Sequence, residues 1–234
     1  MGWFESTETP GVMLGDEAFD RAYELLHELA RCYRGGVGRK PTLEELRALL
    51  QTELRVAGAE LCEDADGKQV EVVFKTKKKP KEQPVEVGDV FAIRLPDGRH
   101  VFGRLMHRGS AQDIVIEVFR ATRRSPAFHP EIAASGRLLH PMNMTSTRAI
   151  NRWRWLVVGT TPGYASPADE IQGLSFVDRN DRNDGFCVRS FAGKQVAAVD
   201  EAEFNRRWDY GQAWYPSAEE VERLSVLALE RASA

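Results

Sequence analysis

The stretch from Gly88 to Met106 constrains the fold more than any other part of the chain. Residues 90–95 and 101–106 are rich in β-branched, aromatic and other apolar side chains, which is typical of two strands. Pro96, Asp97 and Gly98 separate them with turn chemistry, since glycine accepts positive φ without steric cost. The stretch therefore predicts a β-hairpin, and none of its residues is an obvious catalyst.

Helical patterns lie at both ends of the chain. Apolar residues from Phe19 to Tyr33 recur every three or four positions, with Asp16 as a plausible N-cap and Gly35-Gly36 as a stop. A capping box at 42–45 precedes leucines with helical spacing, so we expect two antiparallel helices that bury these leucines. A second capping box, at 217–220, opens a C-terminal helix.

Between the helical ends, the pattern is that of short strands and loops. Alternating residues predict strands at 69–76 and 113–119, and we also expect a strand at 152–159 and short strands between 176 and 199. Two other segments are expected to lack regular structure: a charged, proline-bounded linker at 75–84 and an irregular region at 121–150. The expected fold class is α+β: an N-terminal helical hairpin, a central antiparallel β-sheet or small barrel, and a C-terminal helix. The expected division is residues 1–60, 61–200 and 201–234, with the last segment packed on the β domain.

Composition favours a soluble cytoplasmic protein. The chain of 234 residues has a formal net charge of −3, which argues against coating nucleic acid by bulk electrostatics. Its three cysteines lie far apart in sequence, without Cys-x-x-Cys spacing, as suits a reducing compartment. The first residues lack the basic and apolar regions of a signal peptide, and no apolar run reaches the roughly 18 residues that span a bilayer.

Motifs for catalysis or metal binding are absent from the sequence. The polar loop at 178–185 resembles a calcium loop only superficially, because Arg182 stands at a ligand position and Phe191 stands where a closing glutamate belongs. The five histidines show no ligand spacing, and there is no nucleophile elbow or phosphate-binding glycine loop. Cys187 lies in an apolar strand, as expected of an inert packed thiol. We therefore predict no catalytic residue, no metal and no cofactor.

Two basic clusters, Lys75–Lys81 and Arg120–Arg124, suggest an alternative function. Together with nearby aromatic residues they would suit a small β-barrel that binds nucleic acid. The aromatic residues, however, fall at strand positions expected to face the core, and a charge run is more often a solvated linker. An enzyme with a dispersed active site is a third possibility, which dependence on a metal or on one histidine would reveal.

The hairpin also carries a family resemblance. Residues 88–93, 95–98 and 102–105 resemble the opening signature of immunity protein family twenty-six of bacterial polymorphic toxin systems. A second match follows in the expected order at Trp155–Pro162, with its tryptophan, apolar pair, glycine and later proline. The resemblance covers about residues 85–162 and leaves out the helical hairpin and the region after 163.

The resemblance implies a non-enzymatic protein that binds a cognate toxin domain in the cytoplasm and neutralises it by stoichiometric occlusion. The partner is then a protein, and neither a membrane nor a nucleic acid is the primary partner. The acidic balance would suit a basic toxin such as a nuclease, because opposite potentials speed association. In that case we expect the toxin to contact the acidic residues Asp178, Asp181 and Asp184.

Overall fold

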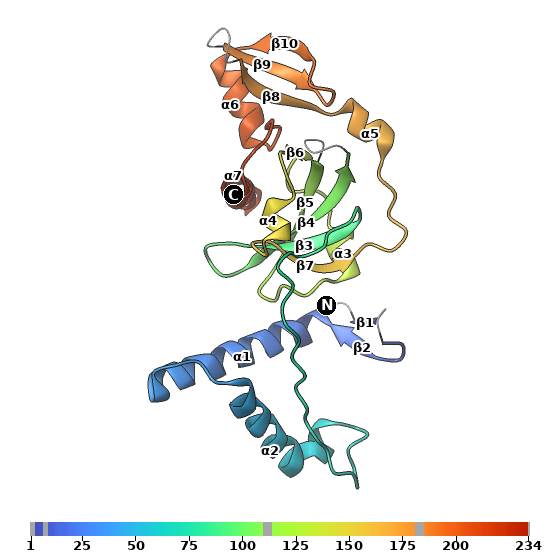
Figure 1. The fold of residues 1–234 in the computed structure, drawn as a ribbon, viewed down its shortest axis with the longest axis vertical. Coiled ribbons are helices and arrows are strands. Elements are labelled where there is room, and N and C mark those ends of the chain that lie inside the picture. Colours follow the sequence, from blue (N-terminus) through green and yellow to red (C-terminus); the bar gives the residue numbers. More distant parts are fainter. Residues whose placement is uncertain (1–2, 7–8, 110–113, 181–184, 234) are drawn as a thin grey trace. The chain divides into compact units, whose positions relative to one another are not determined.

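The computed structural model describes residues 3–6, 9–109, 114–180 and 185–233 (Figure 1). The chain divides into two compact units. One combines Met1–Asp20 with Lys81–Ala234, and the other is Arg21–Pro80. No described helix is long and apolar enough to cross a lipid bilayer.

The unit at 21–80 is built on two helices, α1 (Asp16–Val37), which begins in the larger unit, and α2 (Leu43–Leu61). Both helices were predicted, and Thr42 and Glu45 form the reciprocal capping box. The expectation that the hairpin buries its leucines was wrong. Leu43 is 54% exposed, and the other leucines of the stripe are only half-buried. Capping and local periodicity form these helices, whereas leucine burial would need a facing apolar surface.

The predicted strand at 69–76 is not formed. Described residues 69–76 have no strand neighbour, and the side-chain amide of Gln51 on α2 takes the place of one. Its Nε2 donates to the carbonyl of Val70 at 2.6 Å, and its Oε1 accepts from the backbone N–H of Val72 at 2.8 Å. Alternation of side chains indicates an extended segment, but a strand also needs a partner strand.

The larger unit is organised on a five-stranded antiparallel sheet in the order β6-β5-β4-β3-β7 (Figure 1). The predicted hairpin is its centre. β3 (Asp89–Arg94) and β4 (His100–Arg108) join through a turn in which Gly98 has φ 85°. The other strands are β5 (Ile114–Arg123), β6 (Met142–Met144) and β7 (Leu156–Thr160).

The β7 strand starts later than predicted. Residues 152–155 were expected to be strand, but α4 (Arg148–Asn151) precedes them and Trp153 has φ 64°. The region at 121–150, expected to be irregular, also contains α3 (Pro130–Ala134) and β6. These are short elements whose strand and helix contacts are long-range, so no local periodicity marks them.

The sheet is buried on both faces. One face packs Phe91, Leu105 and Trp155 against Val221 and Leu224 of α7 (Ala218–Ser233). The opposite face packs Phe102 and Phe119 against Ile132 of α3. The middle strands are therefore apolar on both faces, as is typical of a covered central strand.

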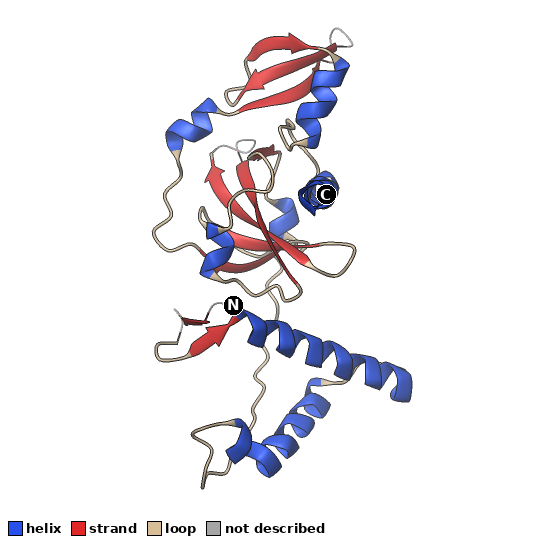
Figure 2. Ribbon diagram, turned by 180° about the vertical axis from the view of Figure 1, so that it is seen from behind, coloured by secondary structure: helices blue, strands red, loops and turns tan. Residues whose placement is uncertain are grey.

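The same unit contains a second sheet, in the order β10-β9-β8. Figure 2 draws its strands as red arrows. Its strands are β8 (Ser175–Asn180), β9 (Gly185–Ser190) and β10 (Gln195–Val199), and α5 (Ala168–Gly173) precedes them. Phe204 of α6 (Glu201–Asp209) packs on Val177 and Val188 of this sheet. A two-stranded ribbon, β1 (Trp3–Glu5) and β2 (Met13–Gly15), lies near the N-terminus. The predicted α+β class is confirmed.

Candidate functional site

The residues that carry the family resemblance have structural roles. A Cβ on Gly103 would lie 2.5 Å from the ring of Phe91, and one on Gly159 would lie 2.5 Å from the ring of Phe128. The carboxylate of Asp89 accepts from the backbone N–H of Glu86 at 2.7 Å and from the Thr160 hydroxyl at 2.6 Å. These residues allow close packing and fix turns.

A buried ion-pair network crosses the sheet face that packs on α3. Glu117 on β5 is 1% exposed and accepts from the Nε of Arg104 at 2.7 Å and from the Nε of Arg137 at 2.5 Å. Arg137 also pairs with Glu170 on α5. A buried carboxylate between two guanidiniums is held in one geometry, and losing one partner would leave a charge uncompensated. The network therefore fixes α5 and the 137 segment to the sheet.

The ring of Tyr164 packs against the Arg104 guanidinium of this network. The guanidinium of Arg104 lies 3.9 Å from its ring centroid, a cation–π contact. Burial raises the pKa of Tyr164, and its hydroxyl has no hydrogen-bond partner among the described residues. A Cβ on Gly88 would lie 3.2 Å from the Tyr164 Cβ, so the first glycine of the signature makes room for this side chain.

The C-terminal helix is anchored at Trp155. The Trp155 Nε1–H donates to Glu222 Oε1 at 2.9 Å, which satisfies the polar edge of an indole that is only 1% exposed. Glu222 also accepts from Arg154 Nε at 2.8 Å. The side-chain Nε2 of buried Gln83 donates to the backbone carbonyls of Ile150 and Trp155. Trp155 thus joins the sheet to α7.

Of the three predicted acidic contact residues, the structure describes Asp178. Asp178 is on β8, and its carboxylate accepts from Arg189 Nε at 2.6 Å. Asp181 and Asp184 lie outside the described residues. Asp178 also lines a pocket of about 640 Å³ with residues of α6, α7 and the segment between them. This acidic–aromatic pocket is defined by Asp178, Phe204, Asn205, Trp208, Asp209, Trp214, Tyr215, Pro216, Ser217, Glu220 and Arg223.

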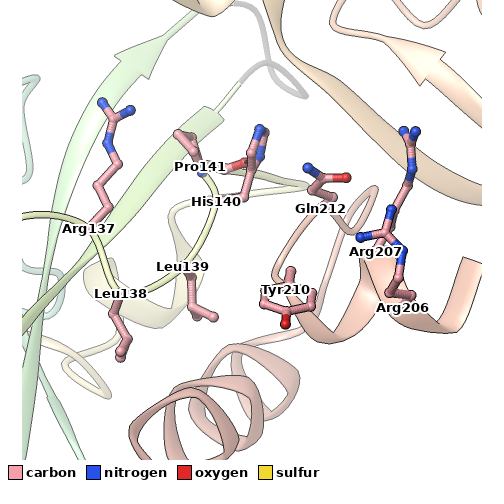
Figure 3. A pocket seen from close by; sticks show the side chains of 9 residues that line it. All are labelled: Arg137, Leu138, Leu139, His140, Pro141, Arg206, Arg207, Tyr210 and Gln212. Carbon is pink, nitrogen blue, oxygen red and sulfur yellow. The ribbon is translucent and has the colours of Figure 1, made fainter. Parts of the chain in front are cut away.

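A second pocket, of about 500 Å³, uses other residues of the same helix (Figure 3). One wall is the segment from Arg137 to Pro141, and the other contains Arg206, Arg207, Tyr210 and Gln212. The walls meet where the His140 N–H donates to the Tyr210 carbonyl at 3.1 Å. Gly211, with φ 85°, permits this approach, since a Cβ there would lie 3.1 Å from that of Leu139.

The charged residues that line this second pocket are arginines, but each is already paired. Arg206 and Arg207 bond Glu203, and Arg137 bonds Glu117 and Glu170. Burial lowers the pKa of His140, and neighbouring Arg137 and Arg207 lower it further. The three arginines of this pocket therefore each have a carboxylate partner within the chain. Helix α6 thus separates an arginine-lined pocket from an acidic, aromatic one.

One group of possible metal ligands occurs in the described part of the chain. Oxygen and nitrogen atoms of Asp16, His129 and Glu131 lie within 4.8 Å of one another. Asp16, however, pairs with Arg123 at 2.8 Å, and His129 Nδ1 caps α3 by accepting from the Glu131 N–H. That bond leaves the proton on Nε2, so neither ring nitrogen offers a free lone pair. The group is better explained as a helix cap beside an ion pair.

Other residues considered in the sequence have ordinary surroundings. Cys187 is buried, and burial raises its thiol pKa, whereas Cys32 and Cys62 are exposed. In the basic cluster at 120–124, Arg120 donates to the carbonyl of Arg137 and Arg123 pairs with Asp16. Phe91 and Phe102 are buried in the core, as their strand positions predicted, and Trp155 is buried although it precedes β7, so these three rings provide no stacking platform for bases.

Sequence reasoning missed both the Glu117 network and the acidic–aromatic pocket. Glu117 interrupts the apolar run from Ile114 to Phe119, which was the available signal, because a buried charge needs a partner charge. The pocket had no local signal. Its residues come from β8, α6 and α7, which are brought together only by tertiary packing.

Comparison with known proteins gives one family. No curated protein and no solved structure matches the chain. Residues 86–184 match the model of the family Immunity protein 26. The matched segment includes the hairpin, Glu117, Trp155 and Tyr164, and it ends before α6 and α7. The resemblance predicted from the hairpin and from Trp155–Pro162 is thereby confirmed: the central part of this chain, residues 86–184, is similar to Immunity protein 26.

Proposed function

We propose that the protein is a non-enzymatic immunity protein that binds a cognate toxin domain in the cytoplasm and neutralises it by stoichiometric occlusion. The match of residues 86–184 to Immunity protein 26 carries the proposal. The structural roles of the matched glycines, Asp89 and Trp155 support it, because a binding scaffold needs a stable frame rather than a catalytic constellation.

The partner contact is proposed at Asp178 of β8 together with Asp181 and Asp184, the acidic residues that follow it in the sequence. Asp178, Asp181 and Asp184 would meet a basic toxin, for example a nuclease, with a complementary potential. Asp178 is 26% exposed and paired with Arg189, so a partner cation can reach its carboxylate. A partner cation would therefore have to share this carboxylate with Arg189.

The test is coexpression with the toxin domain encoded next to the gene. Cells should survive toxin induction only when the protein is present, and the two proteins should copurify in a fixed ratio. The triple variant D178K/D181K/D184K should lose protection, whereas the matched reversal of Asp64, which is 90% exposed on the other unit, should keep it. Failure of the native protein to protect or copurify would contradict the function. Unchanged binding by the triple variant would contradict only the proposed contact.

A further inference from the structure

We propose that the acidic–aromatic pocket binds a lysine or arginine side chain of the protein partner; this rests on the proposed function for the identity of the partner. The walls are aromatic. Trp208 projects from α6, and Trp214 and Tyr215 lie on the segment between α6 and α7 with ring centroids 4.7 Å apart. Aromatic faces attract a cation within about 6 Å, by about 0.5–2 kcal/mol.

The carboxylates of the pocket come from three elements. Asp178 is on β8, Asp209 ends α6 and Glu220 is in the first turn of α7. Arg223 is the cation of the lining, and it bonds Glu220 at 2.7 Å while lying 3.7 Å from Asp209. Two of the three carboxylates of the pocket therefore already bind one guanidinium, that of Arg223. Asp178 and Asp209 have further partners in Arg189 and Arg231, which are 28% and 43% exposed.

The aromatic residues are held in place before any partner arrives. The Trp208 Nε1–H donates to Glu220, which fixes the plane of the indole. The Trp214 N–H donates to the Val177 carbonyl at 2.9 Å, and the Tyr215 N–H donates to the Asn143 carbonyl at 3.0 Å. Tyr215 has φ 57°, a conformation that costs a non-glycine residue energy and is often found at ligand clamps.

Charge and shape together favour a cationic side chain over the alternatives. An anion would meet Asp178, Asp209 and Glu220. An apolar side chain would leave those carboxylates without a new partner and would desolvate them. A lysine or arginine can stack on the rings while it shares the three carboxylates with the arginines that already pair with them, Arg189, Arg223 and Arg231. The pocket lies after residue 184 except for Asp178, so it is formed mainly outside the family-matched segment.

The experiment titrates the full chain with the tripeptide acetyl-Gly-Arg-Gly-amide and with its citrulline counterpart, which has the same shape but no charge. The side-chain N–H signals of Trp208 and Trp214 are followed by NMR, with Trp208→Phe used for assignment. Saturable shifts are expected with the arginine peptide, and binding of the citrulline peptide should be about tenfold weaker. Asp209→Asn should weaken arginine binding about threefold. Asp97→Asn, at an exposed aspartate paired with Arg99, should not.

Equal binding of both peptides, or no saturable shift of either tryptophan, would overturn the pocket assignment. Binding that Asp209→Asn leaves unchanged would also overturn it. These outcomes do not depend on the toxin. If the protein protects cells but does not bind the arginine peptide, only the pocket assignment is contradicted. If the protein binds the peptide but neither protects cells nor copurifies with the toxin domain, the proposed function is contradicted.

Discussion

The indole of Trp155 stacks on the ring of Phe91, with centroids 5.3 Å apart and ring planes 7° from parallel. The two residues belong to the two separate stretches that carry the family resemblance. Phe91 also covers Gly103, its direct partner across the β3–β4 ladder. The two stretches therefore meet in one aromatic stack in the core.

A methyl group at Gly103 should disrupt this stack. Gly103→Ala would place a Cβ 2.5 Å from Phe91 and 2.9 Å from the Glu117 carbonyl, and overpacking of this kind costs about 1–3 kcal/mol. Urea denaturation should show the lower free energy of unfolding. Gly173→Ala is the matched control, since nothing lies within 4 Å of its Cβ position. Equal stability of the two variants would contradict the stack.

Removal of the buried charge at residue 117 should be more severe. Glu117→Gln leaves the guanidiniums of Arg104 and Arg137 without their shared carboxylate, at a cost of about 3 kcal/mol. Glu170→Gln removes a carboxylate that is 37% exposed, and it should cost less than about 1 kcal/mol. Thermal unfolding of both variants measures the difference, and a larger loss for Glu170→Gln would refute the network as described.

Mild acid should weaken the fold through two histidines. Burial lowers the pKa of both His100 and His140 in the folded protein. Below about pH 6.5 the unfolded chain takes up these protons more readily than the folded one, so stability is complete above that pH and falls as pH decreases. The free energy of unfolding should be lower at pH 5.5 than at pH 7.5. His140→Gln should reduce this difference, whereas a change of exposed His27 should not.

The cysteines should differ in reactivity. Cys32 and Cys62 are exposed, whereas Cys187 is buried with a raised thiol pKa. A thiol reagent should modify two cysteines rapidly in the native protein and the third only when urea unfolds it. Rapid modification of all three in buffer would show that β9 is not packed as described.

Local chemistry in the sequence determines much of this fold. The Asp97-Gly98 turn, the capping box at Thr42 and the Ser217 hydroxyl that accepts from the Glu220 N–H all follow from short-range rules. Pairing does not. No described strand pairs with residues 69–76, where Gln51 bonds the backbone instead. The β6 strand was missed because the β5 residues that pair with it, such as Ile116 with Met142, lie far earlier in the sequence.

The candidate site was less predictable than the fold. The polar loop at 178–185 was singled out from its charge, and the contact predicted for its aspartates stays a prediction, although Asp178 lines a pocket. Trp208 and Glu220 could not be assigned to that pocket, because helical periodicity shows which residues share a helix face but not what the face meets. The helix face is identified only when α6 packs on the second sheet through Phe204.

Titration of a fixed amount of the cognate toxin domain with this protein tests the central claim most directly, with residual toxin activity as the readout. Stoichiometric occlusion predicts a linear fall to zero activity at about one equivalent, independent of incubation time once binding is complete. Full toxin activity at excess protein would contradict an immunity role. Progressive loss of activity at a small fraction of one equivalent would contradict stoichiometric binding and indicate turnover.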